Sequence, residues 1–113
     1  MALNLFAGAP VTDSAAALAC YEQVPGAPPS FFPHDTEAVW QLAEHRDVYL
    51  VQRPGQSGNA MHTVLVDDLD TRVAQIADRG LRPTKRESYP GDLRKVIYHD
   101  PDGNEFGFGG TSP

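Results

Sequence analysis

The chain has very little cysteine and no long apolar run. Cys20 is the only cysteine among 113 residues, so no disulfide can form within the chain, and a reducing compartment is expected. No stretch approaches the ~20 consecutive apolar residues of a membrane-spanning helix. The first residues also lack the basic segment of a secretory signal. We therefore expect a cytoplasmic protein that has no membrane partner.

Basic residues are scarce as well. Fifteen acidic residues oppose nine basic ones, which gives a formal net charge of −6 and argues against a nucleic-acid partner. Residues 1–52 hold six acidic residues and one basic residue. Five basic residues gather in one predicted hairpin: Arg82, Lys85, Arg86, Arg94 and Lys95. Two interpretations stay open. The residues form a solvated sheet edge, or they form a patch that binds an anionic group or an acidic partner surface.

The composition is that of a folded globular protein. Hydrophobic residues make up 41% of the chain and charged residues 21%, and 113 residues are enough for one domain, 1–113, with its own core. Cys20 falls on the apolar side of a predicted helix, so we expect a buried small hydrophobic residue there and not a nucleophile.

The first half of the chain reads as a strand, a helix and three strands. Asp13 is expected to cap a helix over about residues 14–23, which Pro25 and Gly26 end. In the strand predicted over residues 36–42, Ala38, Trp40 and Leu42 share one apolar face. The other strands are predicted over residues 4–10, 30–32 and 47–52.

The second half repeats this order after the polar, glycine-rich connector of residues 53–59. Asp68 is expected to cap a helix over about residues 69–79, with Leu69, Val73 and Ile76 buried and Gly80 at its end. Strands are predicted over residues 61–66, 81–86, 93–99 and 105–108. The halves align at an offset of 55 residues, which pairs Val11 with Val66, Asp13 with Asp68, Leu18 with Val73 and Tyr21 with Ile76.

Asp100-Pro101-Asp102-Gly103-Asn104 stands before the last predicted strand. Pro101 fixes φ, Gly103 accepts a positive φ, and the side chains of Asp102 and Asn104 can bond their own backbone. The segment therefore predicts a tight turn. It is not an EF-hand, because the further oxygen ligands and the closing glutamate of that loop are missing.

The doubled unit, the Val-Xaa-Asp entry to each helix and this turn together resemble the vicinal oxygen chelate superfamily, which includes glyoxalase I, bleomycin-resistance proteins and extradiol dioxygenases. The resemblance covers about residues 3–109. It implies an α+β fold of two tandem βαβββ modules, residues 3–53 and 59–110, forming a curved mixed sheet around a cleft. It also implies a homodimer; whether modules are exchanged between chains stays open.

Enzymes of the superfamily hold a divalent metal in that cleft. Three of the expected ligand positions fall on Phe6, Met61 and Gly107, which offer no oxygen or nitrogen donor, and the fourth is best matched by Gln52. We therefore expect no metal and no other cofactor. An alternative metal set is His62, Gln52 and Glu105, although strand alternation sends His62 to the opposite face. His34, His45 and His99 lie in or beside predicted turns and are expected at the surface.

Three functions follow as alternatives. The first is a metal-free, bleomycin-resistance-like protein that binds a small organic ligand, aromatic or cationic, in the cleft. The residues expected to contact this ligand could equally pack as part of the core. Trp40 would stack on the ligand, Phe6 and Met61 would shape the floor, and Glu105 would supply charge. The full set of expected contacts is Phe6, Trp40, Tyr49, Gln52, Met61, Thr63, Tyr98 and Glu105. The second function is a metal-dependent, glyoxalase-like lyase or isomerase that uses the alternative metal set. The third is a module that binds a protein partner.

Overall fold

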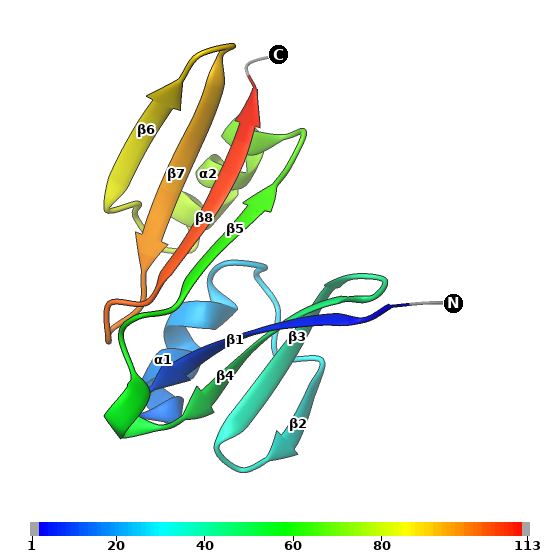
Figure 1. Cartoon of the computed structure of the whole chain (residues 1–113), viewed down its shortest axis with the longest axis vertical. Coiled ribbons are helices and arrows are strands. Elements are labelled where there is room, and N and C mark those ends of the chain that lie inside the picture. Colours follow the sequence, from blue (N-terminus) through cyan, green and yellow to red (C-terminus); the bar gives the residue numbers. More distant parts are fainter. Residues whose placement is uncertain (1–2, 112–113) are drawn as a thin grey trace.

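The computed structural model describes residues 3–111 and arranges them as two four-stranded mixed sheets and two α-helices (Figure 1). The first half contains β1 (Leu5–Val11), α1 (Ser14–Glu22), β2 (Phe31–His34), β3 (Glu37–Ala43) and β4 (Arg46–Gln52). After a 3₁₀ turn, Pro54–Gln56, come β5 (Met61–Leu65), α2 (Leu69–Asp78), β6 (Lys85–Tyr89), β7 (Leu93–His99) and β8 (Glu105–Thr111). Within residues 3–111, no helix is long and apolar enough to cross a membrane.

The two sheets have the same strand order. The first sheet runs β1-β4-β3-β2 and the second β5-β8-β7-β6, with the first strand of each half parallel to the last. Figure 1 shows the sheets meeting at one end, beside the central connector and the turn before β8, and diverging from there. The doubled βαβββ architecture expected from the sequence is confirmed. It takes the form of two separate sheets.

Most predicted elements lie within one or two residues of the observed ones, and β6 and β8 are the exceptions. The strand expected over residues 81–86 begins at Lys85 instead, and residues 81–84 form a loop. Pro83 explains the shift, because it has no N–H to donate to a neighbouring strand. The last strand extends to Thr111, beyond the expected end at Phe108.

Only one of the two predicted helix caps forms. Asp13 Oδ1 accepts hydrogen bonds from the backbone N–H groups of Ala15 at 3.0 Å and Ala16 at 3.3 Å, as the sequence predicts. The prediction for Asp68 was wrong, because its side chain makes no capping hydrogen bond. Its Oδ1 instead pairs with Nε of Arg72 at 2.7 Å, one helical turn further along.

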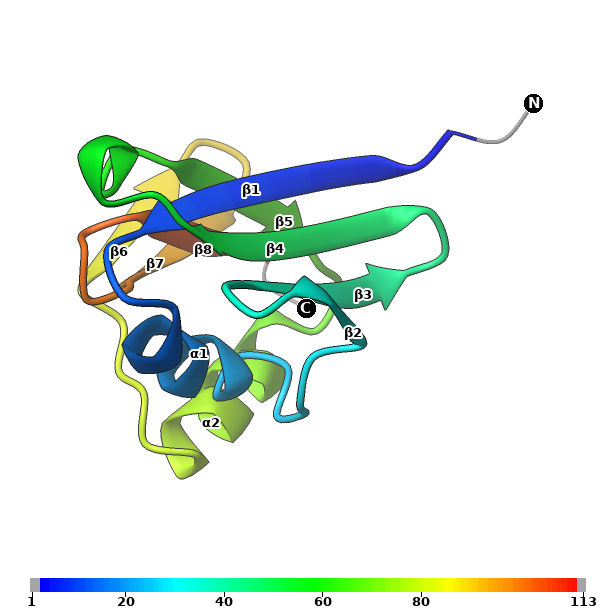
Figure 2. The same ribbon diagram turned by 90° about the horizontal axis from the view of Figure 1, so that it is seen from below.

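Aromatic side chains link the two halves in the core. Tyr21 of α1 stacks on Trp40 with ring centroids 5.9 Å apart and packs against Phe106 of β8 at 5.3 Å. Phe106 in turn stacks on Tyr98 at 5.7 Å. Figure 2 shows α1 and α2 on the same side of the molecule. Because α1 contacts residues of both sheets, burial of its apolar face ties the two halves together.

The turn before β8 is confirmed, and Gly103 has the expected positive φ of 94°. The hydrogen bonds differ from those expected. Asp100, which is 5% exposed, closes the turn by accepting at Oδ1 from the backbone N–H groups of Asp102 (2.9 Å) and Asn104 (3.0 Å). Asp102 Oδ2 accepts from the backbone N–H of Thr12 at 2.9 Å. The turn therefore contacts the first half of the chain directly.

Asn104 is fully buried and makes four side-chain hydrogen bonds. Its Nδ2 donates to Pro10 O and to Asp100 Oδ2, both at 2.8 Å. Its Oδ1 accepts from the backbone N–H groups of Gly58 at 3.1 Å and Ala60 at 2.9 Å. One side chain thus joins β1, the central connector and the turn.

Candidate functional site

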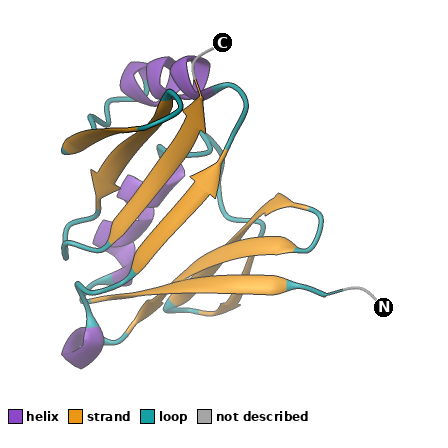
Figure 3. Cartoon of the chain, turned by 45° about the horizontal axis from the view of Figure 1, so that its top comes forward, coloured by secondary structure: helices purple, strands orange, loops and turns teal. Residues whose placement is uncertain are grey.

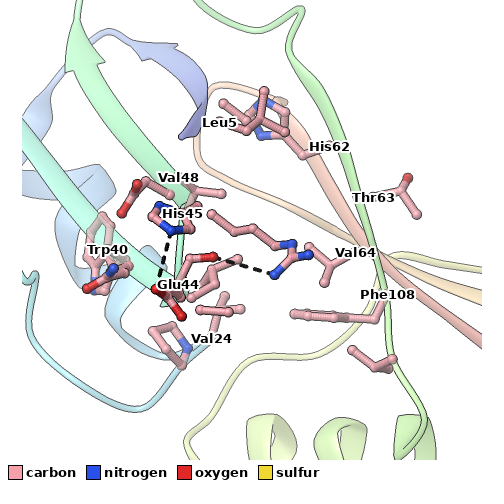
Figure 4. A pocket seen from close by; sticks show the side chains of 18 of the residues that line it. Leu5, Val24, Trp40, Glu44, His45, Val48, His62, Thr63, Val64 and Phe108 are labelled. Atoms are coloured by element: carbon pink, nitrogen blue, oxygen red, sulfur yellow. Dashed lines mark hydrogen bonds and ion pairs between the residues drawn. The ribbon is translucent and has the colours of Figure 1, made fainter. Parts of the chain in front are cut away.

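The two sheets diverge from the end at which they meet (Figure 3). A groove with a volume of roughly 1730 Å³ lies between them (Figure 4). One wall comes from β1, β3 and β4 and includes Leu5, Trp40 and Val48. The other comes from β5 with Phe108 of β8, and the segment after α1 closes one end. Alternation along β5 points His62 and Val64 into the groove, while Thr63 points away in Figure 4.

Charged side chains also line this groove. The β3–β4 turn supplies Glu44, and β4 begins with Arg46, whose Nη1 lies 3.5 Å from the carbonyl oxygen of Glu44. His45 Nε2 lies 3.3 Å from Oε1 of Glu44, and its Nδ1 hydrogen-bonds to Asn4. Asp47, Asp67 and Arg72 complete the charged lining. The lining of the groove therefore combines apolar and charged side chains, which suits an amphipathic ligand.

His62 is one of two histidines that line the groove, the other being His45. Burial lowers the pKa of its imidazole below the usual value, and a hydrogen bond to the backbone of Gly8 opposes part of that effect. His62 stands on β5, an edge strand of the second sheet, and Gly8 stands on β1, an edge strand of the first. The neutral imidazole is the form that the groove favours.

Three of the eight predicted contact residues border the groove: Trp40, Met61 and Thr63. The side chains of Met61 and Thr63 lie on the same face of β5 and point away from the groove, so of the three only Trp40 turns its side chain to it. Trp40 is only 3% exposed, stacks on Tyr21, and donates from Nε1 to Ala27 O at 3.1 Å. It therefore forms part of the wall and also packs as core. Met61 is 71% exposed on the edge strand.

The other five predicted residues lie elsewhere. Tyr98 is fully buried among aromatic rings. Phe6 and Tyr49 lie on the outer face of the first sheet, opposite the core face that carries Ala9 and Leu50. Gln52 Oε1 accepts from the backbone N–H of Ser14 at 3.0 Å, and Glu105 lies on the outer face of the second sheet. The structure does not bring the eight residues to one cleft.

The donors needed for a metal centre are not brought together. Phe6, Met61 and Gly107 occupy the positions that the resemblance assigns to ligands, and none has an oxygen or nitrogen donor in its side chain. His62 and Glu105 point to opposite faces of the second sheet, so with Gln52 they do not form the alternative set. Among residues 3–111 no three His, Cys, Asp or Glu side chains are grouped as metal ligands would be. The residues present do not fit a catalytic metal ion.

Sequence reasoning missed part of the groove lining. Val48, Val64 and Phe108 belong to strands that the sequence predicts, but the pattern of apolar residues does not distinguish a core residue from one that lines a groove. The same limit applies to Val24 and Pro25, which read as the end of a helix. The one sequence pattern that identifies residues of the groove is the alternation in β5, which places His62 and Val64 on the same face of that strand.

Comparison with known proteins places this fold. The sequence model described as a glyoxalase-like domain matches residues 6–108. Among curated proteins no match was found. A crystal structure described as a glyoxalase / bleomycin resistance protein from Catenulispora acidiphila DSM 44928 is 50% identical, with a TM-score of 0.94, and the alignment covers 98% of this chain and 100% of that one.

Two more distant structures share the fold. A bleomycin resistance determinant encoded on the transposon Tn5 is 17% identical, with a TM-score of 0.78 over 99% of this chain and 100% of that one. TnmS3, an antibiotic binding protein from Streptomyces sp. CB03234, is 22% identical, with a TM-score of 0.70 over 99% and 98%. The doubled βαβββ fold and the match over almost the whole sequence lead to one conclusion: the chain belongs to the glyoxalase-like domain family of the vicinal oxygen chelate superfamily.

Proposed function

We propose that this protein binds a bulky, amphipathic organic molecule in the groove between its sheets, acting as a metal-free homodimer. The observation that supports this proposal most strongly is the groove itself, which is lined by both apolar and charged side chains. Ligand pockets for drug-sized molecules measure roughly 300–1,000 Å³, so a drug-sized molecule fits with room to spare. The antibiotic-binding description of TnmS3 and the resistance role of the Tn5 protein favour a ligand of this class.

Exposed apolar side chains around the groove support the homodimer. Leu5 on β1 is 68% exposed, and Met61 and Leu65 on β5 are 71% and 76% exposed. Each of these strands pairs on one side only, so both present a free edge beside the groove. Apolar side chains gathered at free edges are typical of a protein interface, and a second copy would close the open side of the groove.

Binding can be followed through Trp40, the only tryptophan of the chain. Bleomycin serves as the bulky cationic probe and anilinonaphthalene sulfonate as an anionic aromatic one. At a hundredfold excess over Kd, a ligand stabilises the folded state by about 2.7 kcal/mol, which raises Tm by several degrees. We expect bleomycin to raise Tm and to change Trp40 fluorescence in a saturable way, because the acidic half of the chain favours a cation.

Val64→Phe narrows the groove and should weaken binding, whereas Thr71→Phe, on an exposed position of α2, should not. A broader library of uncharged and anionic aromatics tests ligands of other charge. The proposal fails if no organic molecule changes Tm or fluorescence, or if Val64→Phe binds as tightly as the parent. Analytical ultracentrifugation tests the dimer separately, with Leu65→Lys expected to produce monomers.

A further inference from the structure

Three polar side chains form a row at one end of the second sheet, away from the groove. His99 ends β7 and Glu105 begins β8, and the two are directly paired across these strands. Thr84 precedes β6 and is held there by a backbone hydrogen bond from its N–H to Ile97 O at 2.8 Å. Residues distant in sequence thus meet through the sheet register.

Within this row each side chain contacts the next. The hydroxyl of Thr84 hydrogen-bonds to Nδ1 of His99, and Nε2 of the same ring lies 3.5 Å from Oε1 of Glu105. A carboxylate beside Nε2 favours the tautomer with its proton there, which leaves Nδ1 to accept a proton from the hydroxyl. Ile97 O, at 3.3 Å, is a second acceptor for that hydroxyl, and it is more distant than the ring nitrogen.

The row is open to small molecules. His99 and Glu105 keep 31% and 26% of their side-chain surface exposed, and Thr84 is exposed. Next to Glu105 on the same face stands Gly107, where a Cβ atom would come within 3.1 Å of Cε of Lys95. Lys95 also reaches this face of the sheet, where it lies opposite Glu87 across β6 and β7.

A second set of the same residue types lies in the β2–β3 turn and differs in one respect. Thr36 Oγ1 lies 3.2 Å from Nδ1 of His34, whose Nε2 lies 2.9 Å from Oε1 of Glu37. Here Nδ1 also accepts the backbone N–H of Thr36 at 3.3 Å. That ring nitrogen closes the turn and is not free for a proton, so this set is a matched control.

From this geometry we infer that Thr84, His99 and Glu105 form a nucleophile, base and orienting carboxylate that hydrolyse small carboxylic esters. Thr84 Oγ1 attacks the carbonyl carbon as its proton passes to Nδ1 of His99, and the ester C–O bond breaks. The alcohol leaves with that proton. Water, deprotonated by His99, then attacks the acyl carbon. The bond between that carbon and Thr84 Oγ1 breaks, Oγ1 takes the proton back from His99, and the carboxylic acid is released. Glu105 acts as a positioning residue.

The test uses p-nitrophenyl acetate with the intact protein. Nitrophenolate release is measured, and the acid-quenched protein is mapped by mass spectrometry for acetyl groups. We expect an acetyl group on Thr84. Thr84→Val and His99→Asn should each lose about 100-fold of the rate above background, as expected for the loss of nucleophile or base. Thr84→Ser should keep most of the rate, and Glu105→Asp should keep more of it than Glu105→Gln.

The matched variants Thr36→Val and His34→Asn should hydrolyse the ester at the parent rate. Circular dichroism confirms that each variant is folded, so a lost rate is not a lost fold. The inference is overturned if Thr84→Val retains the parent rate, if acetyl groups appear only on other residues, or if the Thr36 and Thr84 variants lose rate equally. Neither groove ligands nor Val64→Phe should alter this rate, which separates the outcome from that of the groove.

Discussion

Replacing Asn104 by leucine should destabilise the protein more than a typical substitution does. The side chain is fully buried and makes four hydrogen bonds, to Pro10, Asp100, Gly58 and Ala60. A net contribution of about 1 kcal/mol per bond, with two backbone N–H groups left without this acceptor, gives a loss on the order of 4 kcal/mol. Domains of this size unfold with roughly 5–15 kcal/mol, so much of the stability would be lost.

Urea unfolding followed by circular dichroism measures this loss. Asn59→Leu is the matched control, because Asn59 is an exposed neighbour in the same connector. We expect the control to lie within ~0.5 kcal/mol of the parent. A loss below ~1 kcal/mol for Asn104→Leu would refute the idea that this side chain joins the two halves.

Asn104→Asp serves if the leucine variant does not fold. It keeps an acceptor for Gly58 and Ala60 but sets a second carboxyl group beside Asp100, whose Oδ2 lies 2.8 Å from Nδ2 in the parent. Two carboxylates this close raise the pKa of one of them. The variant should therefore gain stability as pH falls through that raised pKa, which the parent should not do.

Three further outcomes are expected. Gly110→Ala should cost about 1–3 kcal/mol, because its Cβ would meet Val66 O at 2.8 Å, whereas Gly55→Ala, with open space around it, should be neutral in the same urea titration. Since the pKa of His62 is lowered by folding, the unfolded chain takes up its proton first; stability should fall as pH drops below about 6.5, and His62→Gln should remove part of that slope in pH-dependent melting. Burial raises the pKa of Cys20 to about 11, so iodoacetamide at pH 8 should label the native thiol at least ~10-fold more slowly than the urea-unfolded one, and equal rates would contradict this burial.

The fold could be predicted because the helix caps, turns and strand patterns of the two halves follow the same order. The offset of 55 residues, the cap at Asp13 and the turn at Gly103 all appear in the structure at the expected places. The errors have physical causes. Pro83 shifts the start of β6 to Lys85, and the side chain of Asp68 forms an ion pair with Arg72 instead of capping its helix.

The site was predicted less well, because alternation tells which residues share a face but not what covers that face. Trp40 was expected to meet a ligand, yet α1 packs on it through Tyr21. Phe6 was expected in the same cleft and lies on the opposite face of its sheet. In contrast, the same period-two rule correctly separated His62 from Glu105.

A crystal structure of the protein soaked or grown with the tightest ligand from the binding screen tests the proposed function most directly. We predict density for the molecule between the sheets, in contact with Trp40, Val64 and Phe108, with a second copy of the chain over the open side. A ligand bound only outside the groove, with these three side chains untouched, would contradict the proposal.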